Sequence, residues 1–592
     1  MHIPSLTTVR RFASRRVHVA FFGEVERIVS SLSLSGRVLF WTLAGILIAS
    51  SLYLLYGVNQ ALLVEVPAQG GSLVEGIVGA PRFINPLLAI SDADRDLSML
   101  IYSGLLKTTD QGTLIPDLAQ DYDVSPDGVT YTFTLKEGAT FHNGTPIRAG
   151  DVLFTVAKAQ DPGLKSPKRA NWDGITAEAI DDRTIVFHLK APYAPFIENA
   201  TLGILPKILW ENVSSDEFPF SSLNTEPVGS GPFRVASIER SPSGIPTSYT
   251  LKPFRDYALG KPFLEDIEFR FFENERDLLS ALERGAVDSA NSLSPGVLAE
   301  FDPRRIERAP LNRVFGVFFN QNQSEILRDK DVRKALALAI DREGLVQSVL
   351  GGYGTPLYGP VPAGILEHLS NENVLGTTTD YAASARDFLG KKGWTWSEEE
   401  KALIFKTKNA KDTRVLSFAL STTNAPELRV TAEYLRKSWE VMGARVEVKI
   451  FEQGDLNQNV IRPRKYDALL FGEVVGRELD LFAFWHSSQR NDPGLNIALY
   501  ANSTADKLLE GLRVSNEDVE KRVLYKRFAA ELEKDAPAVF LYTPDFMYVF
   551  PERIEGLSLG SIGIPSERFL SAHMWHTETD RVWSFFTRFT HY

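Results

Sequence analysis

The sequence offers few residues arranged for covalent chemistry. It contains no cysteine, which excludes thiol nucleophiles, disulfides, iron–sulfur clusters and cysteine-type zinc sites. It has no G-x-S-x-G, H-E-x-x-H or Walker-type phosphate motif either. The only close histidine pair is His573 and His576, and without a third ligand nearby we favour a packing or surface role over metal binding. The residues therefore make an enzyme the less favoured class, and we expect no cofactor and no catalytic or metal site.

The composition is that of a large folded protein. The chain has 592 residues, of which 44% are hydrophobic and 23% charged, and this length predicts about three to five domains. Its net charge of −11 would repel a phosphate backbone, so we exclude a nucleic-acid partner.

Charge is distributed unevenly along the chain. Residues 1–37 carry six arginines and two glutamates, residues 38–58 carry no charged side chain, and the remaining residues hold a net charge of −15. The 21 uncharged residues would span about 31 Å as a helix, enough to cross a bilayer. Arginines before this segment predict a cytoplasmic N-terminus and an exported body. We expect a basic head at 1–37, a transmembrane anchor at 38–58 and a linker at 59–71.

A cleaved signal peptide is the nearest alternative for this segment. Signal peptides have a shorter apolar region that ends at small residues, whereas this one ends in Leu54, Leu55 and Tyr56. A buried core helix is less consistent with so long an uncharged run. We therefore favour an uncleaved anchor.

Short alternating strands and amphipathic helices follow the linker. Residues 121–136 have a Pro-Asp-Gly turn and then alternate Tyr131, Phe133 and Leu135 with threonines, which predicts a hairpin. Residues 184–190 and 445–450 alternate in the same way. Residues 426–442 predict a helix with Asn424 as its possible cap and Val430, Tyr434, Leu435 and Met442 close to one face, ended by Gly443. Residues 331–352 predict two helices broken around Asp341. Together they indicate a mixed α/β (α+β) body of two lobes.

Six segments, in order, resemble a known family. They lie at residues 101–160, 228–235 (VGSGPFRV), 318–349, 381–394, 466–472 (YDALLFG) and 496–509. All resemble the bacterial extracellular solute-binding proteins of family 5, which are the oligopeptide-, dipeptide- and nickel-binding proteins of ABC importers. Many relatives are tethered by a lipid on an N-terminal cysteine, and here the segment 38–58 would take over that role.

The resemblance implies a two-lobed periplasmic-binding-protein type II fold with three domains. The first would comprise residues 72–108, 226–311 and 545–592, the second would be inserted at 109–225, and residues 312–544 would form the opposite lobe. By the same resemblance, a monomeric ectodomain would close about a hinge on a short peptide or similar solute and present it to the permease subunits of an ABC transporter.

The resemblance also suggests where a ligand would bind. Peptide binders commonly have Gly-Trp after a strand and then an aspartate that pairs with the amino group of the peptide. This chain has Gly472 and Glu473 there and no aspartate up to Gly476, so the alignable carboxylates are Glu473, Glu478 and Asp480, and Arg477 could meet an anionic group. The candidate contacts are Asn85, Ser91, Asp92, Ser421, Thr422, Thr423, Asn424, Gly472, Glu473, Val474, Arg477, Asp480, Trp485 and Asn496.

Structural roles remain open for most of these residues. Asn85 could form a turn, residues 421–424 could cap the following helix, Trp485 could belong to the core, and the charges of residues 473–480 could be solvated. Alternatives for the whole chain are a sensory receptor without import and a nickel, haem or other small-solute binder. An extracellular hydrolase is the least favoured.

Overall fold

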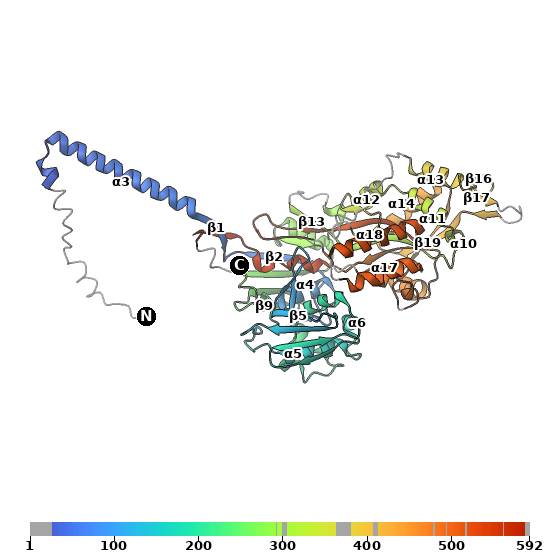
Figure 1. Ribbon diagram of the computed structural model, residues 1–592, viewed down its shortest axis with the longest axis horizontal. Coiled ribbons are helices and arrows are strands. Elements are labelled where there is room, and N and C mark those ends of the chain that lie inside the picture. The colour runs from blue at the N-terminus through green and yellow to red at the C-terminus, as the bar shows by residue number, and fades with distance from the viewer. Residues whose placement is uncertain are drawn as a thin grey trace. The chain divides into compact units, whose positions relative to one another are not determined.

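A computed structural model describes residues 27–291, 293–298, 305–362, 380–406, 413–476, 480–492, 494–515, 518–560 and 562–585. The chain forms two compact units, one comprising Met1–Pro67 with Thr579–Tyr592 and the other Ala68–Glu578 (Figure 1).

The first unit is built around one long apolar helix. Helix α3 (Leu34–Leu62) has 29 residues, none of them buried, and is long and apolar enough to cross a membrane. It contains the predicted anchor 38–58. The predicted linker is partly regular, because β1 (Leu63–Ala68) pairs with β23 (Glu578–Trp583). Three hydrogen bonds reinforce this pairing: Arg581 donates two to Glu65, and the indole of Trp583 donates one to Asn59.

The second unit contains a mixed sheet of 12 strands among the described residues. Its order is β20-β19-β21-β14-β22-β12-β2-β11-β10-β9, with β13 and β15 also paired to β22. The bounds are β2 Ser72–Val78, β9 Phe233–Arg240, β10 Pro246–Pro253, β11 Asp266–Phe272, β12 Ser289–Asn291, β13 Ile306–Pro310, β14 Arg313–Phe319, β15 Gly354–Pro356, β19 Ser417–Thr423, β20 Arg445–Phe451, β21 Ala468–Val474 and β22 Ala538–Val549.

Strand β22 belongs to both halves of this sheet. Its first part pairs with β14 through Ala538–Tyr542, and its last part pairs with β13 through Asp545–Val549. The hydrophobic cores divide at the same place. One large core and a small one draw on residues before 312 and after 545, whereas two other cores draw on residues 314–542. The exact three-domain boundaries remain a prediction.

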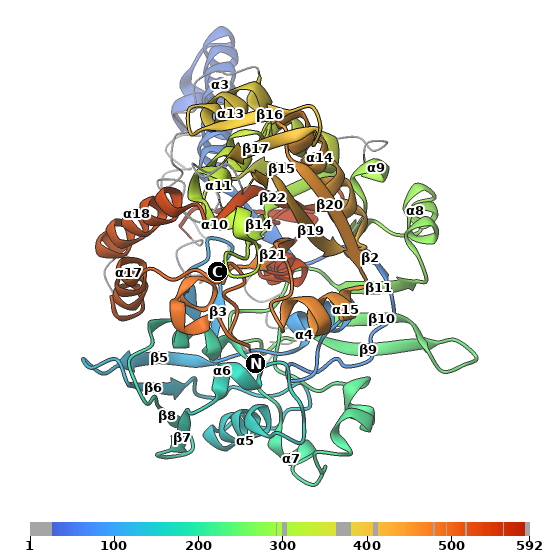
Figure 2. The same cartoon turned by 90° about the vertical axis from the view of Figure 1, so that its right-hand side faces the viewer.

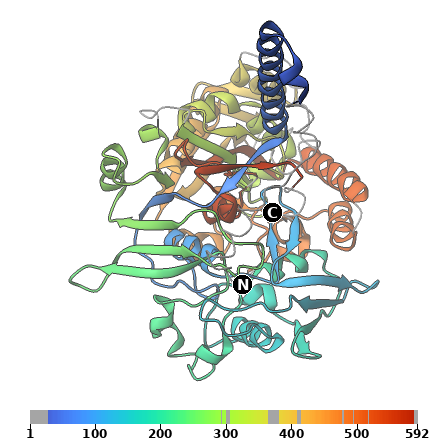
Figure 3. The same cartoon turned by 90° about the vertical axis from the view of Figure 1, so that its left-hand side faces the viewer.

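Smaller sheets and helices surround the main sheet (Figures 2 and 3). The strands are β3 Leu106–Thr108, β4 Leu114–Pro116, β5 Ala119–Val124, β6 Thr130–Leu135, β7 Thr176–Ala179, β8 Thr184–His188, β16 Trp394–Ser397, β17 Ala402–Lys406 and β18 Thr413–Val415. The helices are α4 Asp92–Ile101, α5 Ala149–Gln160, α6 Arg169–Trp172, α7 Lys207–Trp210, α8 Glu275–Glu283, α9 Pro295–Leu298, α10 Glu325–Arg328, α11 Lys330–Leu338, α12 Arg342–Leu350, α13 Tyr381–Gly390, α14 Pro426–Met442, α15 Gln453–Asp455, α16 Phe482–Trp485, α17 Ser503–Val514 and α18 Asp518–Asp535. Shorter turns are η1 Ala194–Thr201, η2 Phe218–Phe220, η3 Ser222–Asn224, η5 Leu456–Ile461, η6 Ser487–Gln489, η7 Pro565–Phe569 and η8 Ala572–Met574.

Local sequence patterns predicted many of these elements. The 121–136 hairpin is β5–β6, with every second residue of β6 buried, and the break at Asp341 is the cap of α12. Helix α14 has the predicted bounds and ends at Gly443, whose φ of 116° favours glycine. Two details were wrong: the cap is Ala425 rather than Asn424, and Val430 is exposed. Leu435 and Met442 are buried as predicted, and Leu428, Ala432 and Trp439 complete the buried face.

Candidate ligand-binding site

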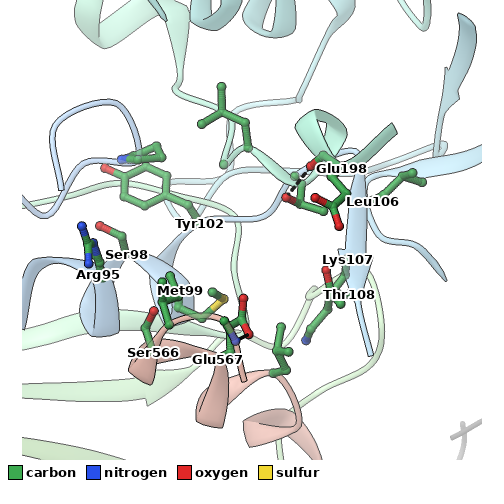
Figure 4. Close-up of a pocket in the computed structure, with 18 of the residues that line it drawn as sticks. Arg95, Ser98, Met99, Tyr102, Leu106, Lys107, Thr108, Glu198, Ser566 and Glu567 are labelled. Carbon is green, nitrogen blue, oxygen red and sulfur yellow. Dashed lines mark hydrogen bonds between the residues drawn. The ribbon is translucent and has the colours of Figure 1, made fainter. Parts of the chain in front are cut away.

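A cavity of about 530 Å³ lies inside the second unit. Its walls come from α4, β3, η1 and η7 (Figure 4) and from residues 474–476, the last residue of β21 and the two that follow it. Its size falls within the range of small-molecule sites in proteins. Helix η1 belongs to the segment 109–225, and residues 474–476 belong to the segment 312–544. Two parts of the chain that are far apart in sequence therefore meet at this cavity.

Helix α4 supplies one wall and is fixed at its start. Ser91 accepts a hydrogen bond from the backbone of Asp94, whose side chain accepts one from the backbone of Ser91, so both orphan amides are satisfied. Ala93, Leu97 and Leu100 are buried in the large core. This packing leaves Arg95, Ser98 and Met99 on the wall of the cavity.

A buried polar group lies at the β3 wall. The Nζ of Lys107 donates to the hydroxyl of Tyr257 at 3.0 Å and lies 3.4 Å from Nδ1 of His573. Burial lowers the pKa of Lys107 to about 8 and raises the pKa of Asp117, which also lines the cavity, to about 6. Burial also lowers the pKa of His573 to about 3, with a further contribution from Lys107. The wall therefore holds groups of both signs that are costly to ionise.

The end of β21 and the two residues after it supply another wall of the cavity. The amide of Val475 donates to the carbonyl of Asn312, and Val474 lines the cavity with 51% of its surface exposed. A Cβ placed on Gly476 would lie 3.9 Å from Oε2 of Glu198 in η1. The ring of Phe315 covers Gly472, where a Cβ would come within 2.6 Å. A side chain at position 472 would therefore displace Phe315.

Glu473 does not line this cavity. Only 6% of its surface is exposed, and it is the cross-strand partner of Val314 on β14. Its Oε1 has no hydrogen-bond partner among the described residues. Burial raises the pKa of Glu473 well above its usual value. Its contact with a ligand remains a prediction.

Asp480 is engaged by other protein groups. Arg513 donates to it through Nε at 2.9 Å and Nη2 at 2.5 Å, and the hydroxyl of Tyr193 donates to it at 3.3 Å. The guanidinium of Arg513 also lies 3.7 Å from the ring centroid of Phe482. Tyr193 precedes η1, so this cluster joins the segment 109–225 to the segment 312–544 beside the cavity.

Replacing Asp480 by asparagine should loosen this junction. The variant loses the charge of a largely buried bidentate pair, and we expect destabilisation of about 1–3 kcal/mol. Because the chain has no cysteine, spin labels on cysteines introduced at the exposed positions Phe220 and Val519 can report the distance between the two segments. We expect a broader distance distribution in Asp480→Asn. Asp182→Asn, which breaks an exposed pair with Arg148, is the control and should leave it unchanged. An unaltered distribution in both variants would contradict the role of the cluster.

Most other predicted contacts have partners within the protein. Asn85 is buried, donates to Asn224 and accepts from the amide of Leu87, which is the turn role that the sequence left open. Ser91 is the cap of α4, and Asp92 is partly buried on its first turn. Ligand contacts of these residues remain predictions.

The predicted residues of the segment 312–544 are similarly engaged. Thr422 donates to the carbonyl of Leu470, Thr423 accepts from the amide of Ala425, Ser421 is buried, and Asn424 donates to Glu452. Trp485 is packed in a core against Phe318, Tyr500 and Phe540, and Asn496 holds the backbone of His486 and Tyr500. Arg477 and Glu478 lie outside the described residues.

Among the predicted contacts, Val474 lines the cavity. Sequence reasoning missed the polar and charged residues of its walls, among them Arg95, Ser98, Lys107, Asp117, Lys168, Glu198, Ser566 and Glu567. The charged residues between 92 and 107 could have pointed to this wall of the cavity. No sequence spacing, however, links them to residues 168, 198 and 566. In the described part of the chain, no group of three or more histidine, aspartate or glutamate side chains could hold a metal ion.

Comparison with known proteins identifies the family. The family model described as bacterial extracellular solute-binding proteins, family 5 Middle, matches residues 113–493. The chain belongs to this family. Protein XP55 of Streptomyces lividans is 31% identical over 496 residues, covering 82% of this chain and 86% of the relative. The oligopeptide-binding protein AppA of Bacillus subtilis (strain 168) is 27% identical over 502 residues, covering 83% and 89%.

Solved structures of this solute-binding family share the fold. The structure of AppA from Bacillus subtilis in complex with a nonapeptide matches with a TM-score of 0.64 and 25% identity, covering 86% of this chain and 99% of AppA. The ABC transporter substrate-binding protein CtaP of Listeria monocytogenes matches with a TM-score of 0.69 and 26% identity, covering 86% and 100%. The predicted α/β periplasmic-binding-protein type II fold is thus confirmed.

Proposed function

We propose that this chain is a membrane-anchored solute-binding protein that captures a short peptide between two lobes and delivers it to an ABC importer. The observation that carries the proposal is the cavity between α4 and residues 474–476, on the fold of a solute-binding family that includes an oligopeptide-binding relative. Its walls combine apolar side chains such as Met99 and Leu570 with charges of both signs. Such a site suits a zwitterionic ligand with apolar parts, as a peptide is.

Closure would follow from the strand arrangement. Residues 311–312 join β13 to β14, and β22 runs alongside both strands. These two adjacent connections between the halves of the sheet would form the hinge. A ligand in the cavity would favour the closed form only by the extra contacts made there. The cluster of Tyr193, Asp480 and Arg513 lies where the two lobes would meet. The closed form would then be the state that permease subunits recognise.

Helix α3 would hold the protein at the cytoplasmic membrane. Its apolar surface, the arginines before it and the acidic body after it favour a cytoplasmic N-terminus and an extracellular or periplasmic body. The intact mass of the purified protein would distinguish this anchor from a cleaved signal peptide.

Titration calorimetry of the full-length protein in detergent tests the proposal. The probes are a pool of random di- to pentapeptides, nickel chloride and a free monosaccharide. We expect saturable heat and a raised melting temperature with the peptide pool, since a ligand at 100 times its Kd adds about 2.7 kcal/mol to stability. Heat with nickel or the sugar but none with peptides would refute peptide binding.

A further inference from the structure

Three cations gather at the α4 side of the cavity. Arg95 and Lys168 line the cavity, and Arg313 at the start of β14 is close enough to Arg95 for their charges to interact. Neither Arg95 nor Lys168 has a carboxylate within ion-pair distance among the described residues, unlike Arg436, which contacts both Glu433 and Glu440. Arg95 and Lys168 can therefore pair with an anionic group of a ligand.

Their mutual repulsion is only partly offset. Lys168 is exposed, yet partial desolvation by its neighbours lowers its pKa, Arg95 lowers the pKa further, and Glu567 opposes this effect. Burial likewise lowers the pKa of Arg313, with Asp92 opposing and Arg95 adding to the effect. Asp92 offsets the repulsion at Arg313 and Glu567 offsets it at Lys168, whereas Arg95 adds to it at both. A bound anion would relieve the repulsion.

Hydrogen-bond donors stand beside these cations. Ser98 on α4 and Ser566 on η7 are buried, line the same cavity, and their hydroxyls have no hydrogen-bond partner among the described residues. Figure 4 shows Arg95 and Ser98 on one side of the cavity and Lys107 and Glu198 on the other. Unsatisfied buried hydroxyls are costly, so a ligand group that accepts from them would be favoured.

We propose that Arg95 and Lys168, assisted by Ser98 and Ser566, bind a carboxylate of the ligand, so that the cavity selects peptides with a free carboxylate at this end. The inference rests on the proposed peptide-binding function and adds the specificity of the site. A peptide can offer a carboxylate at its C-terminus or on an acidic side chain, and the two sources share this chemistry. Charge-assisted hydrogen bonds to the guanidinium and ammonium groups would supply the selectivity.

Four peptide pools test the inference by calorimetry on the full-length protein in detergent. The pools are random tripeptides with a free or an amidated C-terminus, each made with or without aspartate and glutamate. We expect the amidated pool without acidic residues to bind at least tenfold more weakly than the others, the loss expected for one charge-assisted hydrogen bond. Comparison of the two pools that carry a single kind of carboxylate identifies its source.

Variants locate the selectivity. Arg95→Gln with Lys168→Met should bind all four pools alike, whereas the control Arg284→Gln with Lys437→Met, which alters exposed cations outside the cavity, should keep the preference. Equal binding of the four pools by the wild-type protein overturns the inference and leaves peptide binding intact. Failure of every pool to bind overturns both. If the double variant unfolds, the binding of the four pools to the wild-type protein still tests the inference.

Discussion

Replacing Arg568 by methionine should lower the free energy of unfolding of the unit Ala68–Glu578 by about 3–5 kcal/mol. Arg568 is 0% exposed and donates to Asp96 at 2.6 and 2.9 Å and to Glu75 at 2.8 Å. Glu75 also accepts from Tyr548 at 2.7 Å. Removal of the only cation of this group leaves two carboxylates buried together. The group joins β2, α4, η7 and β22, so its loss should also loosen the α4 and η7 walls of the cavity.

The measurement is thermal and urea unfolding of the full-length protein in detergent. Arg436→Met, which removes a partly exposed arginine paired on α14, is the control and should cost about 0–1 kcal/mol. Adding Glu75→Gln and Asp96→Asn to Arg568→Met should recover part of the loss, because the buried negative charge is then removed. Burial already raises the pKa of Asp96 to about 6, against the effect of Arg568. Equal unfolding of the Arg568 and Arg436 variants would contradict the network.

Replacing Glu473 by leucine should stabilise the protein, by about 1–3 kcal/mol at pH 7. The side chain is buried beside Val314, its Oε1 has no partner among the described residues, and the cost of this burial disappears in the variant. The folded-state pKa of Glu473 is raised, so the wild-type protein must lose stability as the pH rises from the unfolded value of about 4.5 towards the folded one. The gain of the leucine variant over wild type should therefore grow with pH.

Melting temperatures between pH 5 and pH 9 check this result. Glu473→Gln keeps the polar group but cannot ionise, so it should lose the pH dependence without the full stabilisation. Glu447→Leu on β20 alters an exposed glutamate and is the matched control, with little expected change. A destabilised leucine variant at every pH would show that Glu473 has a partner. If the variant also failed to bind peptide, a ligand contact by Glu473 would be favoured.

The sequence predicted local structure better than the site. Helix α14 and the β5–β6 hairpin depend on capping, glycine and alternation, which are encoded within about 20 neighbouring residues. Asp480 was a ligand candidate because the family resemblance made it one of the alignable carboxylates after β21. Its partners, Arg513 and Tyr193, lie 33 and 287 residues away. Likewise Trp485 is a core residue whose burial depends on Phe318 and Phe540 of the distant strands β14 and β22.

The walls of the cavity also consist of residues that lie far apart in the sequence. Arg95, Lys168, Glu198 and Ser566 meet only because α4, η1 and η7 pack around one core. No periodicity relates their positions, and the family resemblance directed attention to the loop 471–486 instead. Val474 is where the two approaches agree, since it lies in that loop and on the wall of the cavity.

Native mass spectrometry of two tryptophan variants tests the central claim most directly. Val474 and Val441 are 51% and 61% exposed, but Val474 lines the cavity and Val441 lies on α14 outside it. With a peptide pool, the wild-type protein and Val441→Trp should carry one bound peptide, whereas Val474→Trp should carry much less because the indole takes up part of the cavity. Equal peptide occupancy of the two variants would show that the ligand binds elsewhere.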